Sequence, residues 1–120
     1  MIRKHTISFK HAFEGLIVAF TTQPNYRIHI FLSILSIVGG IYFGITYGEF
    51  LIIGVLITVG LVIETINTAI EETCDAIDEA IRPDIKIAKD TAAAAMLIFA
   101  CGATILAGII FVPHIIQLNI

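Results

Sequence analysis

Four oxygen-bearing side chains recur on one side of a single predicted helix. They are Glu64, Asn67, Glu71 and Asp75, within the segment ETINTAIEETCD. At 100° per residue they fall at about 0°, −60°, −20° and +20° around the helix axis, so they form one polar stripe. No cation lies among them, and Mg²⁺ prefers oxygen ligands of this kind, often one or two carboxylates completed by phosphates and water. The stripe therefore suggests a Mg²⁺ site. Together with the basic residues that follow across a short loop, such a site at a membrane boundary suggests phosphoryl transfer between a soluble nucleotide and a lipid.

The stripe begins where a long apolar segment ends. Residues 50–63, FLIIGVLITVGLVI, run into Glu64 without a break. A charge at such a depth in a membrane costs at least a few kcal/mol if it is unpaired, and ionisable groups there usually face a cavity or a partner. A solvated helix face is the alternative explanation, and it suits Asp78 and Glu79 better than it suits Glu64.

The composition places these residues in an all-α membrane protein. The chain has 120 residues, of which 58% are hydrophobic and 14% are charged, so we expect a single domain over residues 1–120. Apolar segments long enough to cross roughly 30 Å of hydrocarbon predict three transmembrane helices. Their expected ranges are about 30–47, 50–70 and 92–112.

An amphipathic helix is expected before the first span, at about residues 8–20. Phenylalanine and aliphatic side chains gather on one side there, with Lys10, His11 and Glu14 largely on the other, as in helices that lie on a membrane surface. Pro24 should end this helix, because proline disfavours helix at the residue before it. The sequence RPD at 82–84 should separate the second span from the third.

The distribution of cations predicts the orientation. All lysines and arginines precede the first span or lie between the second and third, namely Arg3, Lys4, Lys10, Arg27, Arg82, Lys86 and Lys89. The positive-inside rule then places the N-terminus and the stripe in the cytosol and the C-terminus outside, in a bacterial inner membrane. A cleaved signal peptide is not expected. No zinc spacing is present, and Cys74 and Cys101 are expected to be small buried hydrophobic residues.

Two short motifs resemble those of a known family. The pattern Glu64-x-Ile-Asn67-Thr-Ala-Ile-Glu71-x-x-x-Asp75 is similar to the signature of the small prokaryotic integral-membrane diacylglycerol kinases and undecaprenol kinases. The tripeptide Ala-Lys89-Asp resembles their second motif, and NYRIH at 25–29 resembles the N-terminal part of the undecaprenol-type members. The chain contains neither a GxxxxGK[ST] phosphate loop nor a protein-kinase signature.

The resemblance implies a catalytic role for the stripe. Glu64 would be the general base on a lipid hydroxyl, and Asn67 would orient that hydroxyl or a phosphate. Glu71 would bind Mg²⁺ and so contact the phosphates of ATP. The family position that matches Gln23 commonly holds a glutamate that is a second metal ligand, so Gln23 departs from the pattern: it offers a carbonyl oxygen without a charge.

The resemblance also implies the binding partners. Lys89 would contact phosphate, Asp90 and Asp75 the nucleoside, and His11 would belong to the same nucleotide site. The family forms homotrimers in the lipid bilayer, with active sites shared between neighbouring subunits, and no nucleic acid is expected to bind.

Two lipid alcohols are candidate substrates. NYRIH and the pattern FxxAxxG at 9–15 favour undecaprenol, and diacylglycerol is the alternative. A small membrane transporter or a non-enzymatic accessory protein are competing classes. A transporter would place its glutamate deep in an early span with no acidic continuation, which Glu64 does not satisfy.

Overall fold

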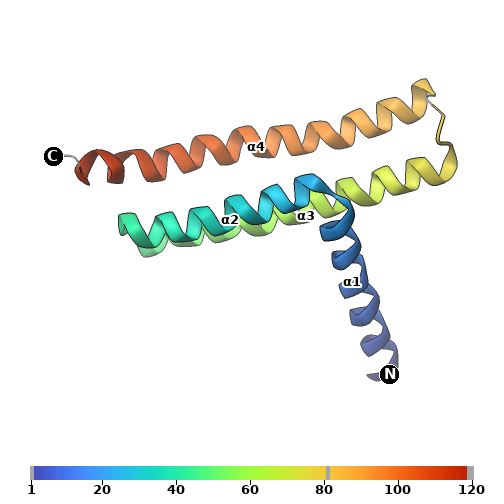
Figure 1. Cartoon of the computed structure of the whole chain (residues 1–120), viewed down its shortest axis with the longest axis horizontal. Coiled ribbons are helices and arrows are strands. Elements are labelled where there is room, and N and C mark those ends of the chain that lie inside the picture. The colour runs from blue at the N-terminus through green and yellow to red at the C-terminus, as the bar shows by residue number, and fades with distance from the viewer. Residues whose placement is uncertain (1, 81, 119–120) are drawn as a thin grey trace.

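The described residues form four α-helices, of which three lie side by side. The computed structural model describes the backbone of residues 2–80 and 82–118, and the side chains from residue 6 onward. The helices are α1 (Ile2–Thr22), α2 (Pro24–Phe43), α3 (Tyr47–Ile77) and α4 (Pro83–Leu118). Helices α2, α3 and α4 run alongside one another, whereas α1 leaves the others at a steep angle (Figure 1).

Gln23 and Pro24 form the corner between α1 and α2. Gln23 has an extended backbone, with φ −102° and ψ 111°, and Pro24 opens α2. A proline fits the first helical position, because its missing amide donor would have no partner there and its φ is already helical. The break predicted at Pro24 is therefore confirmed.

The turn between α2 and α3 depends on Gly44. This glycine has a left-handed φ of 66°, which glycine adopts without a steric penalty, and the Ile45 amide donates to the Gly40 carbonyl at 3.1 Å. Thr46 then caps α3 in a reciprocal arrangement with Glu49. Helix α2 consequently ends at Phe43, and residues 44–46 of the first expected span lie in the turn.

Helix α3 continues without interruption from the apolar segment through the polar stripe. It has 31 residues and ends at Ile77, where Asp78 caps it. The Ala80 amide donates to Asp78 Oδ1 at 2.8 Å, and Pro83 begins α4 after a short turn. The break predicted at RPD is confirmed. The α3–α4 turn and the helical ends beside it extend beyond α2 (Figure 1), and we call this part of the molecule the polar end.

The opposite end of the bundle holds a small apolar core and one ion pair. Ile45, Ile53 and Ile110 are buried there together. His114 Nε2 lies 3.0 Å from Glu49 Oε2 and joins α4 to the first turn of α3. The apolar core and the His114–Glu49 pair hold α3 and α4 together at the end of the bundle away from the stripe.

Most large apolar side chains face outward, as a lipid environment requires. Phe31, Leu35, Leu97 and Ile98 are exposed, and α2, α3 and α4 are each long and apolar enough to cross a membrane. Exposed apolar surface on this scale marks contact with lipid or with other proteins. The prediction of an all-helical membrane protein with three long apolar helices is confirmed. The position of α1 on the membrane surface and the assembly into a trimer stay predictions. The side chains of Arg3 and Lys4 lie outside the described residues.

Candidate functional site

Glu64 is a buried carboxylate that faces a pocket. Its side chain is 1% exposed, and its Oε2 atom has no hydrogen-bond partner among the described residues. The pocket has a volume of about 300 Å³ and lies between α2, α3 and α4, with Asn25, His29 and Met96 among the lining residues. A buried polar atom without a partner is rare in folded proteins, and such an atom can mark a catalytic position.

Asn67 and Glu71 continue the site toward the polar end. Asn67 Nδ2 donates to Glu71 Oε1 at 3.2 Å. Asn67 is 7% exposed, and its Oδ1 atom is a second buried oxygen for which the described part of the chain provides no partner. Because the stripe has the phase expected of a helix, these three side chains lie on one side of α3. The bond orients the amide and leaves its carbonyl oxygen available to a ligand.

Lys89, on α4, contacts the end of the stripe that lies nearest the α3–α4 turn. Its Nζ donates to Asp75 Oδ1 at 2.5 Å, which links α4 to α3 across the turn. The Lys89 side chain is 37% exposed, so the cation is accessible from the polar end. Asp90 does not join this pair, because its carboxylate accepts from Lys86 one helical turn away.

His11 and Gln23 lie apart from the stripe in the single chain. The ring Nδ1 of His11 is 3.0 Å from Glu14 Oε2, and both side chains are exposed on α1. Gln23 is partly buried at the α1–α2 corner, and within the described range no hydrogen bond joins it to Glu71. The structure brings together Glu64, Asn67, Glu71, Asp75 and Lys89, and it leaves His11, Gln23 and Asp90 outside this group.

The oxygen donors of the stripe fit Mg²⁺ only in combination with other ligands. Among the described residues, no group of three histidine, cysteine, aspartate or glutamate side chains is placed to hold a metal ion. The unpartnered oxygens of Glu64 and Asn67, with the carboxylate of Glu71, are hard donors of the type that Mg²⁺ accepts. The arrangement therefore fits an ion held by one or two protein oxygens, with phosphates and water as the remaining ligands.

His29 is a site residue that the sequence did not identify. It lines the Glu64 pocket, and its ring centroid lies 6.0 Å from that of Phe99 on α4. Its position in NYRIH, at the start of the first span, predicts only an interfacial hydrogen-bonding residue. The packing of α2 against α3 and α4 brings this ring to Glu64, and no pattern within a single helix contains that information.

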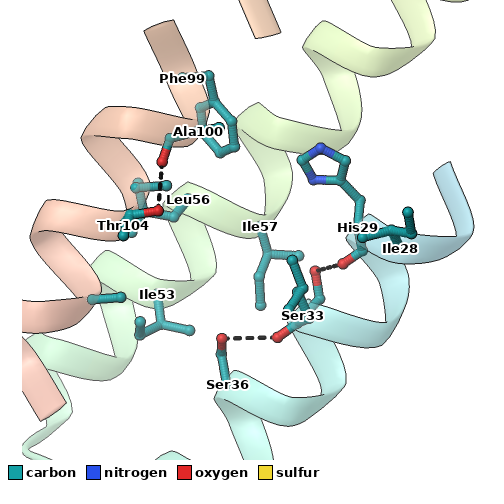
Figure 2. A pocket seen from close by; sticks show the side chains of 13 residues that line it. Ile28, His29, Ser33, Ser36, Ile53, Leu56, Ile57, Phe99, Ala100 and Thr104 are labelled. Carbon is teal, nitrogen blue, oxygen red and sulfur yellow. Dashed lines mark hydrogen bonds between the residues drawn. The ribbon is translucent and has the colours of Figure 1, made fainter. Parts of the chain in front are cut away.

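A second pocket extends from the first between α2, α3 and α4. Its volume is also about 300 Å³, and Figure 2 shows side chains from α2, α3 and α4 around it, including His29, Ile57 and Phe99. The two pockets share Ile28, His29 and Ala100 as lining residues. The Glu64 site therefore adjoins a second, mostly apolar pocket between the same three helices.

The chain is similar to known proteins over most of its length. Residues 10–111 match the family described as prokaryotic diacylglycerol kinase. The chain belongs to this family. It is 30% identical over 115 residues to a diacylglycerol kinase of Synechocystis sp., where the match covers 95% of this chain and spans 66% of the relative's length. It is 34% identical over 108 residues to an undecaprenol kinase of Bacillus subtilis, covering 90% and 88% of the two chains.

The family membership confirms the prediction of a lipid kinase at the level of the family. Both relatives carry the name of a kinase, and their names differ in the lipid. The five residues that the structure brings together, from Glu64 to Lys89, all fall within the matched range.

Proposed function

We propose that this chain transfers the γ-phosphate of ATP directly to the hydroxyl group of a membrane lipid alcohol, in a reaction that depends on Mg²⁺. The observation that carries the proposal is the Glu64 carboxylate, which is buried, has an oxygen without a partner among the described residues and faces a pocket that adjoins a second, apolar pocket. A lipid hydroxyl can reach this pocket from the bilayer, and a nucleotide can approach the rest of the stripe from the polar end.

Each residue of the stripe has a distinct task in the proposed reaction. Glu64 accepts the proton of the lipid hydroxyl while the hydroxyl oxygen bonds to the γ-phosphorus and ADP departs. Asn67 keeps its carbonyl oxygen free through the bond to Glu71 and orients the attacking group. Glu71 holds the metal, which neutralises charge on the phosphates when it is bound.

Lys89 and the acidic residues around it form the nucleotide side of the site. The ammonium group of Lys89 leaves Asp75 for a phosphate of ATP, because it is accessible and lies at the polar end of the stripe. Asp75 and Asp90 are then available to the nucleoside, and His11 and Gln23 complete the site from α1 and its corner.

We propose a homotrimer with shared active sites, which would account for the last of these assignments. His11 lies on α1, which leaves the other three helices of its own chain (Figure 1), so a neighbouring subunit is the partner that can use it. We assign the polar end to the cytosol of a bacterial inner membrane, since Arg82, Lys86 and Lys89 lie there, and the C-terminus to the outside.

Undecaprenol is the lipid alcohol that we favour, and diacylglycerol is the alternative. NYRIH and the FxxAxxG pattern support undecaprenol, and one of the two relatives carries that name.

The direct test is magnesium-dependent ATP consumption by the purified protein on addition of undecaprenol or diacylglycerol in the same detergent. Glu64→Gln should lower turnover by about 10²–10⁴-fold while nucleotide binding stays near that of the wild type, because only the proton acceptor is lost. Glu72→Gln is the matched control, since it removes an exposed carboxylate from the same helix. Two results would contradict the proposal. One is a rate of ATP consumption that does not change when either lipid is added, and the other is a Glu64→Gln variant with more than half of wild-type activity.

A further inference from the structure

One titratable pair lies outside the proposed active site and joins two helices at the other end of the bundle. Nε2 of His114 on α4 lies 3.0 Å from Oε2 and 3.3 Å from Oε1 of Glu49 on α3. The two side chains are 19% and 25% exposed, so both are largely withdrawn from water. An ionised carboxylate can only accept hydrogen bonds, and the imidazole Nε2–H group is therefore the donor.

The same carboxylate also caps α3. Oε2 of Glu49 accepts from the Thr46 amide at 2.7 Å and from the Thr46 hydroxyl at 2.9 Å. Thr46 belongs to the turn that follows α2, and its neighbour Ile45 is buried in the apolar core. One carboxylate therefore holds the start of α3 in place and also presents its charge to α4.

The last residues of α4 follow a weak point in the helix. Pro113 has no amide hydrogen, so the helical hydrogen bond to the Ile109 carbonyl is missing there, and proline is a common cause of bending. Before this point, Ile110 is buried in the apolar core. After it, residues 115–118 are exposed, whereas His114 is partly buried. The end of α4 is thus a short segment behind a hinge, and His114 joins it to α3.

The pair has no competing charge in the helices packed around it. Residues 28–63 and 91–120, which contain the facing parts of α2, α3 and α4, have no lysine or arginine and one acidic residue, Glu49. The tyrosines near this end, Tyr42 on α2 and Tyr47 on α3, are 77% and 79% exposed, and tyrosine is ordinarily uncharged near neutral pH. The imidazole is therefore the group that can neutralise the carboxylate.

The charge of the imidazole determines how strongly the pair holds. A protonated imidazole forms an ion pair with the carboxylate, and the helix dipoles favour an anion at the start of α3 and a cation near the end of α4. A neutral imidazole can keep the Nε2–H hydrogen bond, but only one of its two partners is then charged. Histidine is the side chain that ordinarily changes its charge between about pH 5 and 8.

We infer that Glu49 and His114 form a pH-dependent clamp, which holds the end of α4 against the start of α3 under mildly acidic conditions and releases it as the pH rises. The stabilisation is present below the range in which histidine titrates, and it is lost as the pH rises through that range. Below about pH 4, where carboxylates ordinarily gain a proton, the ion pair is lost as well. The clamp is independent of the proposed lipid kinase reaction.

Unfolding in mixed micelles at about pH 6 and about pH 8.5, at one protein concentration, tests the clamp. Between these values the unfolding equilibrium constant of the wild type should rise about three- to tenfold relative to that of His114→Gln, which keeps a donor without the charge. Glu49→Gln should behave like His114→Gln, because glutamine still completes the capping box. His11→Gln is the matched control: His11 Nδ1 also lies 3.0 Å from a glutamate oxygen, but that pair is exposed within α1 and contributes little.

Hydrogen exchange gives a local readout at the end of α4. Comparison of the wild type with His114→Gln at the same pH cancels the intrinsic effect of pH on the exchange rate. At about pH 6 the amides of residues 114–118 should exchange at least about threefold more slowly in the wild type, and at about pH 8.5 the two rates should be equal. The amides of residues 99–109 should exchange alike in both proteins, since they lie before Pro113 and beside the apolar core.

The results that would overturn the clamp are specific. One is a parallel pH dependence of unfolding in the wild type and His114→Gln, and another is equal exchange of residues 114–118 in the two proteins at about pH 6. A third is loss of the pH dependence in His11→Gln to the same extent. If His114→Gln does not fold, the wild type decides: exchange at 114–118 relative to 99–109 should accelerate between the two pH values, and a constant ratio overturns the clamp.

Discussion

Gly60 is a point of close approach between α2, α3 and α4 beside the site. A Cβ atom added there would lie 2.7 Å from two ring carbons of Phe99 and 3.4 Å from Nδ1 of His29. Carbon atoms pack best at about 3.5–4.0 Å, so the Gly60→Ala methyl group is too close to the Phe99 ring by about 0.8–1.3 Å. The ring, and with it α4, has to move away from α3.

The expected cost is that of an overpacked core, about 1–3 kcal/mol. Alanine is also the better helix former by up to about 1 kcal/mol, which offsets part of this cost. Gly54→Ala gives the same gain in helix propensity, and its Cβ meets nothing within 4 Å in the described chain. The difference between the two variants therefore isolates the steric effect at Gly60.

Unfolding of both variants in mixed micelles with increasing SDS, followed by circular dichroism, measures this difference. We expect Gly60→Ala to be less stable than Gly54→Ala by about 1–3 kcal/mol. Because Phe99 and His29 line the apolar pocket beside the Glu64 site, the KM for the lipid alcohol should rise in Gly60→Ala as well. Equal unfolding curves for the two variants would refute the close packing of α3 against α4 at Gly60.

Three other substitutions address the nucleotide side of the site. Glu71→Ala should weaken Mg·ATP binding together with turnover, and added Mg²⁺ should recover part of the loss; unchanged nucleotide affinity at limiting Mg²⁺ would exclude Glu71 as a ligand. Gln23→Glu should lower the Mg²⁺ concentration for half-maximal activity, because a hard cation prefers an anionic oxygen to an amide carbonyl, and a titration that superimposes on wild type would remove Gln23 from the metal site. Lys89→Met should raise the KM for ATP without changing that for the lipid, and an unchanged KM for ATP would remove Lys89 from the nucleotide site.

The amino-acid sequence by itself determined the features that depend on neighbouring residues. The phase of Glu64, Asn67 and Glu71 follows from the helical period, and the structure keeps them on one side of an unbroken α3. The break at Pro24 follows from the chemistry of proline. Each of these features needs only the residues within a few turns of one helix.

The end of α2 is a local feature that the hydropathy pattern did not predict. The expected first span continued to about residue 47, because the apolar residues around Gly44 continue the pattern of α2. Helix α2 ends at Phe43 instead, since Gly44 takes a left-handed backbone that lets the chain reverse. A hydropathy pattern contains no information on the backbone dihedral angles of Gly44.

Only the tertiary structure decided how the site is enclosed. The burial of Glu64, the position of His29 beside its pocket and the bond between Lys89 and Asp75 each join side chains from different helices. Such contacts depend on the distance and rotation between packed helices, and these are set by close steric fits such as that of Phe99 on Gly60. A periodic pattern specifies which face of a helix is polar, but the side chain that meets this face from another helix follows only from the packing.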